Sequence, residues 1–343
     1  MIELKTPRGL SVNVPETESE DPSPKFDARD SAGIKSYYDQ NGYVIVRSLF
    51  QSSDCERIRE LWDKEVKPSR EFIYRQATAK AEKHVFNSKN WVMNPILNLQ
   101  SVDPEKYPGF RAFATKSILA ANAFTDVFRV LFAGESPKIV QSMYFEGNSA
   151  TWEHQDSYYL DSERIGSMAA AWIAIEDIHA RAGRFFISPG SHNIDLGKQS
   201  LANNIADGHE SYIQSVVAKT RELNLQIRAP LLEKGDVLFW NAWTIHGSLD
   251  SQDLDYSRSS ITCHAIPDSH RFLQLQTRLI PLQLDTVNGV RIHRPKDLAC
   301  MPNRAIFWLE THFPSLFYGV KKRAIKTLLW LRERRDRTSG LTS

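Results

Sequence analysis

Short segments rich in β-branched and aromatic residues run through the middle of this 343-residue chain, and turn signals separate them. Such segments are typical of strands, because each is only a few residues long and ends near glycine, proline or asparagine. Since they follow a helical lead-in, we predict a mainly β fold with α additions: a double-stranded β-helix, or cupin-like jelly roll, flanked by helices. The segments are 139–145, 168–176, 184–188, 225–228, 236–240 and 259–266.

The remainder of the chain predicts helices, turns and one insertion around this core. Residues 31–40 are compatible with a helix that ends at Asn41-Gly42, and 113–132 has apolar residues every three or four positions. The polar segment 196–222 predicts an inserted helix and loop. Asn288-Gly289 predicts a hairpin turn between alternating apolar residues.

This order of elements predicts one elaborated domain, because β cores with helical additions often reach this size. Acidic residues and prolines are frequent in 1–25, which we expect to be a flexible N-terminal tail. Residues 26–343 then form a single domain. Within it we expect a helical lead-in (30–135), a jelly-roll core (about 137–290) and a C-terminal helical extension (about 300–340).

Charge and cysteine content narrow the class of protein. The net charge of +2 is too balanced to make nucleic acid the expected partner. Cys55, Cys263 and Cys300 are scattered, so neither a disulfide framework nor a thiolate zinc site is indicated, and we expect a reducing, cytoplasmic location. No apolar stretch reaches the length of a membrane span, and the N-terminus lacks the order of a signal peptide.

His154, Asp156 and His246 form a candidate metal site. An i, i+2 pair in an extended segment places both side chains on one face, as a shared ion requires, and His246 follows another predicted strand. Two imidazoles and one carboxylate occupy three corners of an iron octahedron and leave three positions open, as in non-haem Fe(II) oxygenases. Structural zinc instead requires four closed ligands rich in sulfur.

A polar row in the last core strand supplies a candidate carboxylate clamp. Arg258, Ser260, Thr262 and His264 alternate along 259–266 and should share one face. Either this face meets solvent, or it lines a polar interior where a guanidinium and a hydroxyl hold a carboxylate. The nearby metal-ligand pattern favours the interior, with a dicarboxylate co-substrate.

Four segments together resemble the phytanoyl-CoA dioxygenase family, whose members are Fe(II)- and 2-oxoglutarate-dependent oxygenases on a double-stranded β-helix. They are 40–46, 152–156, 182–192 and 235–248, and the resemblance covers roughly 30–267. It implies that His154, Asp156 and His246 bind iron.

The same resemblance implies a set of co-substrate residues. Arg258 would bind the distal carboxylate of 2-oxoglutarate with help from Ser248, Trp172 would line the co-substrate pocket, and Gln141 would lie near the site. The chain departs from the family at Arg184, where many members carry a small or apolar residue.

The expected reaction is hydroxylation of an unactivated C–H bond in a small molecule, with O2 as oxidant and succinate and CO2 released. The carboxylate of Asp156 favours hydroxylation over halogenation, since halogenating relatives replace this ligand by a small residue. Two alternatives remain open: a non-catalytic jelly-roll module that binds a ligand and retains a metal site, and a zinc- or nickel-dependent cupin-type isomerase or hydrolase.

Substrate signals are weaker. Tyr158 and Tyr159 could contact a ligand or could pack on the sheet, and Arg184 and His264 suggest an anionic small molecule. The basic segment 321–335 could touch a membrane surface or an acidic partner, but packing on the domain with solvated charges is the favoured interpretation.

Overall fold

The computed structural model describes residues 1–147, 149–194, 196, 205–324 and 327, and its centre is a nine-stranded sheet. Neighbouring strands are antiparallel except at β19–β8 and β3–β4. The main path runs, in order, through β18 (Leu284–Val287), β19 (Val290–His293), β8 (Pro137–Phe145), β15 (Ser260–Pro267), β11 (Ala169–Ala174), β13 (Val237–Asn241), β4 (Tyr43–Val46) and β3 (Lys25–Phe26).

A second layer of short strands faces this sheet and completes the jelly roll, so the predicted fold class is confirmed. One three-stranded sheet has the order β12 (Phe185–Ile187), β14 (His246–Ser248) and β9 (Thr151–His154). Another has the order β10 (Leu160–Ser162), β16 (Phe272–Gln274) and β17 (Arg278–Ile280). Side chains that alternate inward from both layers enclose the space in which a site can form.

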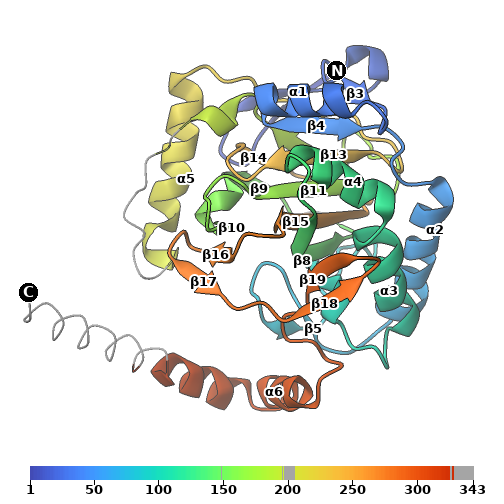
Figure 1. The fold of residues 1–343 in the computed structure, drawn as a ribbon, viewed down its shortest axis with the longest axis vertical. Helices are drawn as coiled ribbons and strands as arrows, with labels where there is room; N and C mark the ends of the chain where they lie inside the picture. Colours follow the sequence, from blue (N-terminus) through green and yellow to red (C-terminus); the bar gives the residue numbers. More distant parts are fainter. Residues whose placement is uncertain (148, 195, 197–204, 325–326, 328–343) are drawn as a thin grey trace, which may run out of the picture.

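Helices cover the outer face of the large sheet (Figure 1). They are α1 (Ser31–Asn41), α2 (Ser52–Leu61), α3 (Pro108–Phe113) and α4 (Asn122–Leu131). Phe128 of α4 meets Phe239 of β13 edge to face at 5.1 Å, within the largest hydrophobic cluster. The helix predicted over 113–132 is interrupted, because the backbone at Ala121 is extended and separates a wide helical turn (Ala114–Leu119) from α4.

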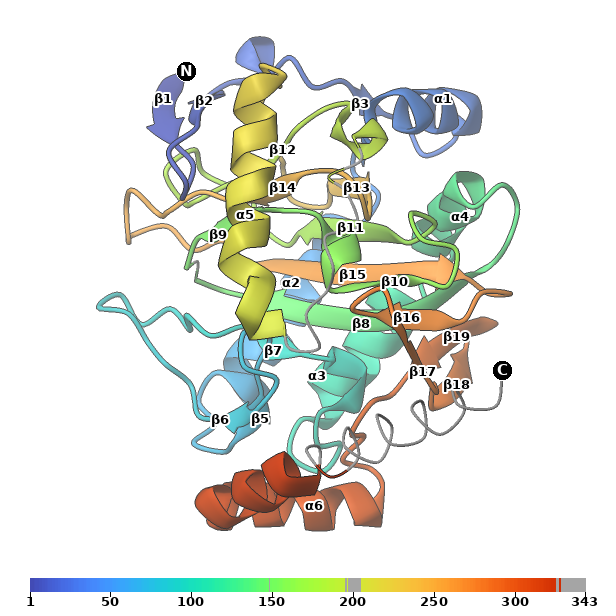
Figure 2. The same cartoon turned by 90° about the vertical axis from the view of Figure 1, so that its left-hand side faces the viewer.

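On the opposite side of the molecule, α5 (Ile205–Glu222) crosses in front of the short strands (Figure 2). It falls in the predicted insertion, of which residues 197–204 lie outside the described part. The predicted hairpin is confirmed as β18–β19, with Asn288-Gly289 at its turn. The predicted strand at 225–228 is wrong: Arg228 makes only isolated bridges, to Asn13 and Ile187.

The prediction of a flexible N-terminal tail is also wrong. β1 (Ile2–Lys5) and β2 (Ser11–Val14) form a hairpin that buries Val12 and Val14 against Phe186 of the short sheet. The hydroxyl of Thr6 donates a hydrogen bond to the buried carboxylate of Glu153. Alternating apolar residues therefore fix this segment, although acidic residues follow it.

The middle of the lead-in is irregular, and the described part of the chain ends in helical segments. Three two-residue strands lie in the lead-in, at β5 (Ile73–Tyr74), β6 (Ala81–Glu82) and β7 (Ile96–Leu97). After β19 the chain forms α6 (Met301–His312) and a further helical segment at 314–324. None of the described helices combines the length and apolar character that crossing a bilayer requires.

Candidate metal centre

The structure brings the three predicted metal ligands together between the two layers. His154 ends β9 and His246 begins β14, and the two residues are direct partners in the antiparallel pair. The Nε2 atom of each imidazole lies 3.6 Å from Oδ1 of Asp156. The three candidate ligand atoms all lie within 4.8 Å of one another, so one ion could contact all three.

Backbone carbonyls fix both imidazoles in the tautomer that a metal needs. Nδ1 of His154 lies 2.8 Å from the carbonyl oxygen of Trp152, and Nδ1 of His246 lies 2.9 Å from that of Thr244. A carbonyl only accepts hydrogen bonds, so each Nδ1 carries the proton and donates it. The lone pair of each Nε2 is then directed toward Asp156, as metal-binding histidines require.

The carboxylate of Asp156 is held by two further side chains. Its Oδ2 accepts a hydrogen bond from the indole nitrogen of Trp240 at 2.9 Å and one from Nε2 of His264 at 3.3 Å. Burial opposes ionisation, but the neighbouring imidazoles of His246, His264 and His154 outweigh it and hold the Asp156 pKa well below its usual range.

This donor set fits a ferrous ion. Two neutral imidazoles and one carboxylate leave three coordination positions for co-substrates, whereas a structural zinc site would be closed by a fourth ligand. Across the described residues, His154, Asp156 and His246 are the one group of three or more such side chains that could share an ion.

Trp240 was missed as a site residue in the sequence, although it lies six positions before His246 and shares its strand parity. The Trp240→Phe variant is expected to bind Fe(II) about 10–100-fold more weakly, because it loses the donor that orients Asp156. Trp62→Phe is the matched control: Trp62 is equally buried and donates to Glu146 at 3.0 Å, and neither residue lines the metal cavity. An unchanged Fe(II) affinity in Trp240→Phe, or an equal loss in Trp62→Phe, would contradict this role.

The metal centre opens into a cavity of about 90 Å³ that Arg258 also lines. Arg258 is 3% exposed, and its guanidinium lies 5.4 Å from the ring of Phe145 and 5.9 Å from that of Trp172. Nη1 donates to the carbonyl of Gly183 at 3.1 Å, whereas Nε is buried with no hydrogen-bond partner among the described residues. Burial lowers the pKa of Arg258 to about 9.

A buried guanidinium is costly unless an anion pairs with it. No carboxylate in the described part of the chain forms an ion pair with Arg258, so a carboxylate from a ligand fits this position. The sequence allowed the polar face of this strand either to meet solvent or to line a polar interior. In the structure Arg258 on this face lines the interior.

Some of the other predicted co-substrate residues line the metal cavity, and others lie outside it. Trp172 and Ser248 line the cavity with Arg258, and the Ser248 hydroxyl accepts a hydrogen bond from the Thr151 amide at 3.0 Å. Ser260 is buried outside the cavity, where its hydroxyl donates to the Arg258 carbonyl at 3.2 Å.

Gln141 lies in a second, larger cavity rather than in the metal cavity. In the β8–β15 pairing, Gln141 lies opposite His264 and Ile139 opposite Ala265, which leaves Val140 as an extra residue in a bulge. Val140 and Gln141 consequently both line this cavity, which has a volume of about 250 Å³. Its walls are mainly apolar and aromatic, and include Phe72, Tyr74, Leu97, Val102, Tyr107 and Phe272.

The predicted substrate residues are largely structural. Tyr158 stacks on Tyr212 of α5 at 3.8 Å and is 8% exposed, as the packing alternative anticipated. Tyr159 donates to or accepts from His209 at 2.7 Å, and its ring lies 5.7 Å from that of His154.

Arg184 points away from both cavities. Its guanidinium donates to the carbonyls of Ile178 (3.0 Å) and Pro15 (2.5 Å), so it holds the N-terminal segment in place. Its neighbour Phe185 instead faces the metal cavity and stacks on His246 at 5.4 Å. His264 lines the metal cavity, where it contacts Asp156.

Known proteins similar to this chain agree with this geometry. Residues 38–258 match the family model described as "Phytanoyl-CoA dioxygenase (PhyH)". Peroxisomal phytanoyl-CoA dioxygenase from Bos taurus is 24% identical over 241 residues, which are 67% of this chain and 66% of the bovine protein. The human protein of the same name is 24% identical over 255 residues, 69% of this chain and 68% of that protein. The match thus spans about two thirds of these relatives.

Solved structures share the fold. The non-haem α-ketoglutarate-dependent carbocyclase SnoK is 16% identical with a TM-score of 0.51, covering 73% of this chain and 89% of that one. EctD from S. alaskensis, solved with 2-oxoglutarate and 5-hydroxyectoine, is 17% identical with a TM-score of 0.51, covering 81% and 90%. The family match and the ligand set agree with Fe(II) as the cofactor and with 2-oxoglutarate and O2 as co-substrates. This chain belongs to the phytanoyl-CoA dioxygenase family.

Proposed function

We propose that the protein is an Fe(II)- and 2-oxoglutarate-dependent hydroxylase that acts on an unactivated C–H bond of a small molecule and releases succinate and CO2. The observation that carries this proposal is the buried guanidinium of Arg258, which forms no ion pair with a carboxylate of the described residues and lies in the same cavity as the His154–Asp156–His246 triad. A ligand-binding module without catalysis has no evident need for a dicarboxylate clamp beside an open metal site.

Each side chain then has a defined task. His154, Asp156 and His246 would hold the ferrous ion, which with 2-oxoglutarate and O2 supplies the oxidising chemistry when bound. Arg258 pairs with the distal carboxylate of 2-oxoglutarate and fixes its orientation, because its planar fork matches a carboxylate.

The surroundings of these groups hold the carboxylate ligand in place and shape the cavity. Trp240 and His264 hold the Asp156 carboxylate in place through its second oxygen. The rings of Trp172 and Phe185 line the cavity and give it apolar walls. Because Asp156 supplies the carboxylate ligand, we favour hydroxylation over halogenation.

We place the substrate in the cavity of about 250 Å³, because Gln141 on its wall is the β8 partner of His264, which lines the metal cavity. Its largely apolar wall suits a small, mainly apolar molecule. The Ser101 hydroxyl lines it, is buried and has no partner among the described residues, so it is available to a polar group of that molecule. An anionic substrate held by Arg184 is not favoured, since Arg184 binds backbone carbonyls.

The free thiols of Cys55, Cys263 and Cys300 support a reducing compartment, and we keep the cytoplasm as the proposed location.

The test is a co-substrate turnover assay with Fe(II), 2-oxoglutarate and O2 across acyl-CoA, amino-acid, phosphonate and natural-product compounds. We expect succinate to form with O2 consumption, and one compound class to increase the rate and gain a hydroxyl group. If 2-oxoglutarate binds but no compound gives turnover, the non-catalytic module is favoured. Conversion of a compound with Zn(II) or Ni(II) and without O2 consumption would favour the isomerase or hydrolase.

A further inference from the structure

The C-terminal helices expose an unusual number of large apolar side chains. Seven of the sixteen large hydrophobic residues that are exposed in the described part of the chain lie within 301–320. Met301 is 74% exposed, Leu316 66% and Val320 58%. The C-terminal apolar face comprises Met301, Ile306, Trp308, Leu309, Phe313, Leu316 and Val320.

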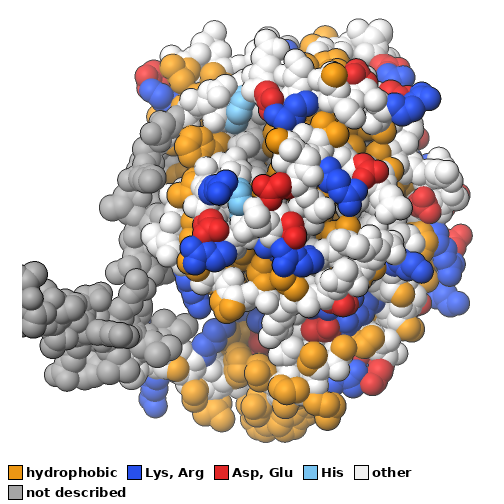
Figure 3. All heavy atoms as spheres, in the orientation of Figure 1, with side chains coloured by type: hydrophobic (Ala, Val, Ile, Leu, Met, Phe, Trp, Pro, Cys, Tyr) orange, Lys and Arg blue, Asp and Glu red, His pale blue; other side chains and the backbone are white. Residues whose placement is uncertain are grey.

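Figure 3 shows hydrophobic side chains gathered along the lower edge of the molecule, where Figure 1 places α6. Apolar residues scattered singly over a surface need no explanation, but a contiguous patch on a folded domain marks an interaction site.

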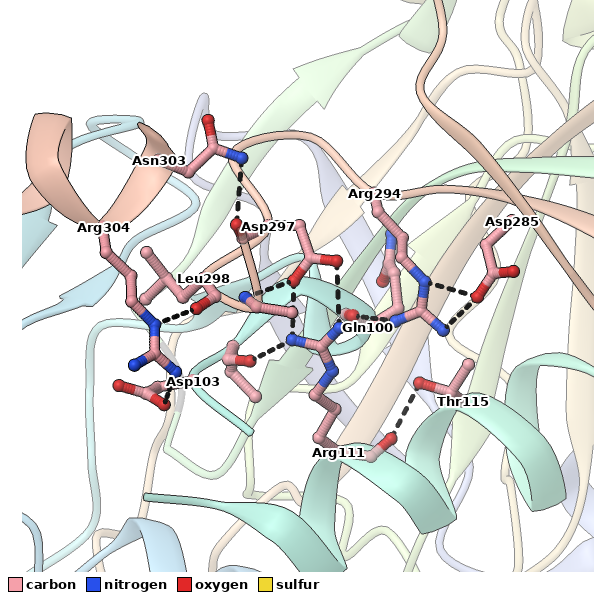
Figure 4. Close-up of polar contacts among 12 residues, drawn as sticks. Gln100, Asp103, Arg111, Thr115, Asp285, Arg294, Asp297, Leu298, Asn303 and Arg304 are labelled. Carbon is pink, nitrogen blue, oxygen red and sulfur yellow. Dashed lines mark hydrogen bonds and ion pairs between the residues drawn. The ribbon is translucent and has the colours of Figure 1, made fainter. Parts of the chain in front are cut away.

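The opposite side of α6 is anchored, so the apolar face has a fixed orientation. Asn303 donates to the carbonyl of Asp297 at 2.9 Å, and Arg304 donates to that of Leu298 at 2.6 Å (Figure 4). Asp297 is itself held by Arg111 of the lead-in at 2.6 and 3.0 Å.

A second anchor lies further along α6. Glu310 is 4% exposed and accepts hydrogen bonds from the Tyr74 hydroxyl and the Ala81 amide, each at 3.0 Å. Docking on the domain therefore uses one side of α6 and leaves the C-terminal apolar face outward.

The charge of this region differs in sign from that of the rest of the chain. Residues 301–343 contain nine Lys and Arg against three Asp and Glu, a net charge of +6, so residues 1–300 carry −4 of the total of +2. Lys321, Lys322 and Arg323 are exposed and follow Val320 directly. Cations thus adjoin the apolar face.

The combination of exposed apolar side chains and adjoining cations indicates which partner would bind the C-terminal apolar face. Exposed tryptophan, phenylalanine and leucine beside lysine and arginine are the features of helices that lie in the interface of an anionic membrane. A symmetric dimer through the same face would instead pair two segments that both carry the exposed cations Lys321, Lys322 and Arg323, and like charges repel. We propose that the C-terminal apolar face is a docking surface for an anionic lipid membrane.

Membrane docking through α6 would also fix the position of the cavity of about 250 Å³ relative to the bilayer. Tyr74 lines that cavity, and its ring contacts Phe307 of α6 at 5.4 Å, so the cavity lies directly behind the docking helix. If the cavity holds the substrate, which rests on the proposed function, the docked enzyme holds its substrate site beside the bilayer.

The test is co-sedimentation of the full-length protein with vesicles of phosphatidylcholine alone or with about 30% phosphatidylserine, at low and high salt. We expect retention by the anionic vesicles, weakened at high salt, and at least about tenfold less retention by neutral vesicles. The double variant Trp308→Ser/Leu316→Ser should lose retention on anionic vesicles by a similar factor. Its control, Leu223→Ser/Leu284→Ser, removes two similarly exposed leucines elsewhere and should bind normally.

Absence of retention on the anionic vesicles overturns the proposal, as does unchanged retention of the Trp308→Ser/Leu316→Ser variant. So does a sedimentation-velocity result in which the wild type is a dimer that this variant converts to a monomer, because the face would then join two copies. Circular dichroism checks that each variant is folded. The vesicle measurement requires no turnover, so it stands apart from any failure of the proposed reaction.

Discussion

The Asp156→Ala variant is expected to lose Fe(II)-dependent succinate formation by more than about 100-fold, beyond the 10–100-fold that loss of an outer-shell partner causes. Asp156 supplies the one anionic ligand of the triad, and its Oδ1 lies 3.6 Å from both imidazole Nε2 atoms. Without it, two neutral imidazoles remain to compete with water for a doubly charged ion. Anaerobic Fe(II) titration and a succinate assay measure the two consequences.

Two further variants sharpen this result. Asp156→Asn keeps an acceptor for Trp240 but removes the negative charge, so it should retain the fold and still bind Fe(II) weakly. Glu163→Ala removes a surface carboxylate that pairs with Arg271, and its activity and Fe(II) affinity should equal those of the wild type. Near-normal succinate formation by Asp156→Ala would contradict the assigned metal centre.

The Arg258→Ala variant is expected to raise the KM for 2-oxoglutarate by at least about 30-fold, equivalent to about 2 kcal/mol, the low end for truncating one partner of a buried charge pair. The Fe(II) affinity should change little, because Arg258 is not a metal ligand. Arg258→Lys should recover only part of the loss, since an ammonium lacks the planar fork that matches a carboxylate. Titration of 2-oxoglutarate into the anaerobic Fe(II) enzyme measures the effect.

Arg184→Ala is the matched control for Arg258→Ala. Both arginines are 3% exposed and both donate to backbone carbonyls, but Arg184 lines neither cavity. Its loss should lower the free energy of unfolding and leave the KM for 2-oxoglutarate unchanged. If the two variants raised this KM equally, the clamp would not be Arg258.

The metal centre could be predicted from sequence because strand geometry is local. His154 and Asp156 are two residues apart at the end of a strand, so alternation alone places them on one side. Alternation also correctly brought Arg258, Thr262 and His264 into one cavity, whereas Ser260 of the same row is buried outside it. The same alternation would have placed the Arg184 side chain outside the metal cavity, since its strand neighbour Phe185 faces into that cavity.

Features that depend on pairing between distant segments could not be predicted. Gln141 lies outside the metal cavity because of the bulge at Val140, and a bulge is defined by the partner strand β15 rather than by the residues around it. The role of His264 as a partner of Asp156 likewise requires β15 and the turn after β9 to meet.

The prediction for the N-terminal segment was wrong for a different reason. The sequence does contain the signal of a hairpin, because the buried Val12 and Val14 alternate with polar residues and pair with Leu4 and Ile2. The acidic residues and prolines that follow dominate the composition of the segment and led to the prediction of a flexible tail.

The most direct test of the account is anaerobic addition of Fe(II) and then 2-oxoglutarate to the wild-type protein, followed by visible absorption. We expect a charge-transfer band that saturates at one Fe(II) and one 2-oxoglutarate per chain, is lost in Asp156→Ala, and requires much more 2-oxoglutarate in Arg258→Ala. A folded wild-type protein without this band, or a band that survives unchanged in Asp156→Ala, would contradict it.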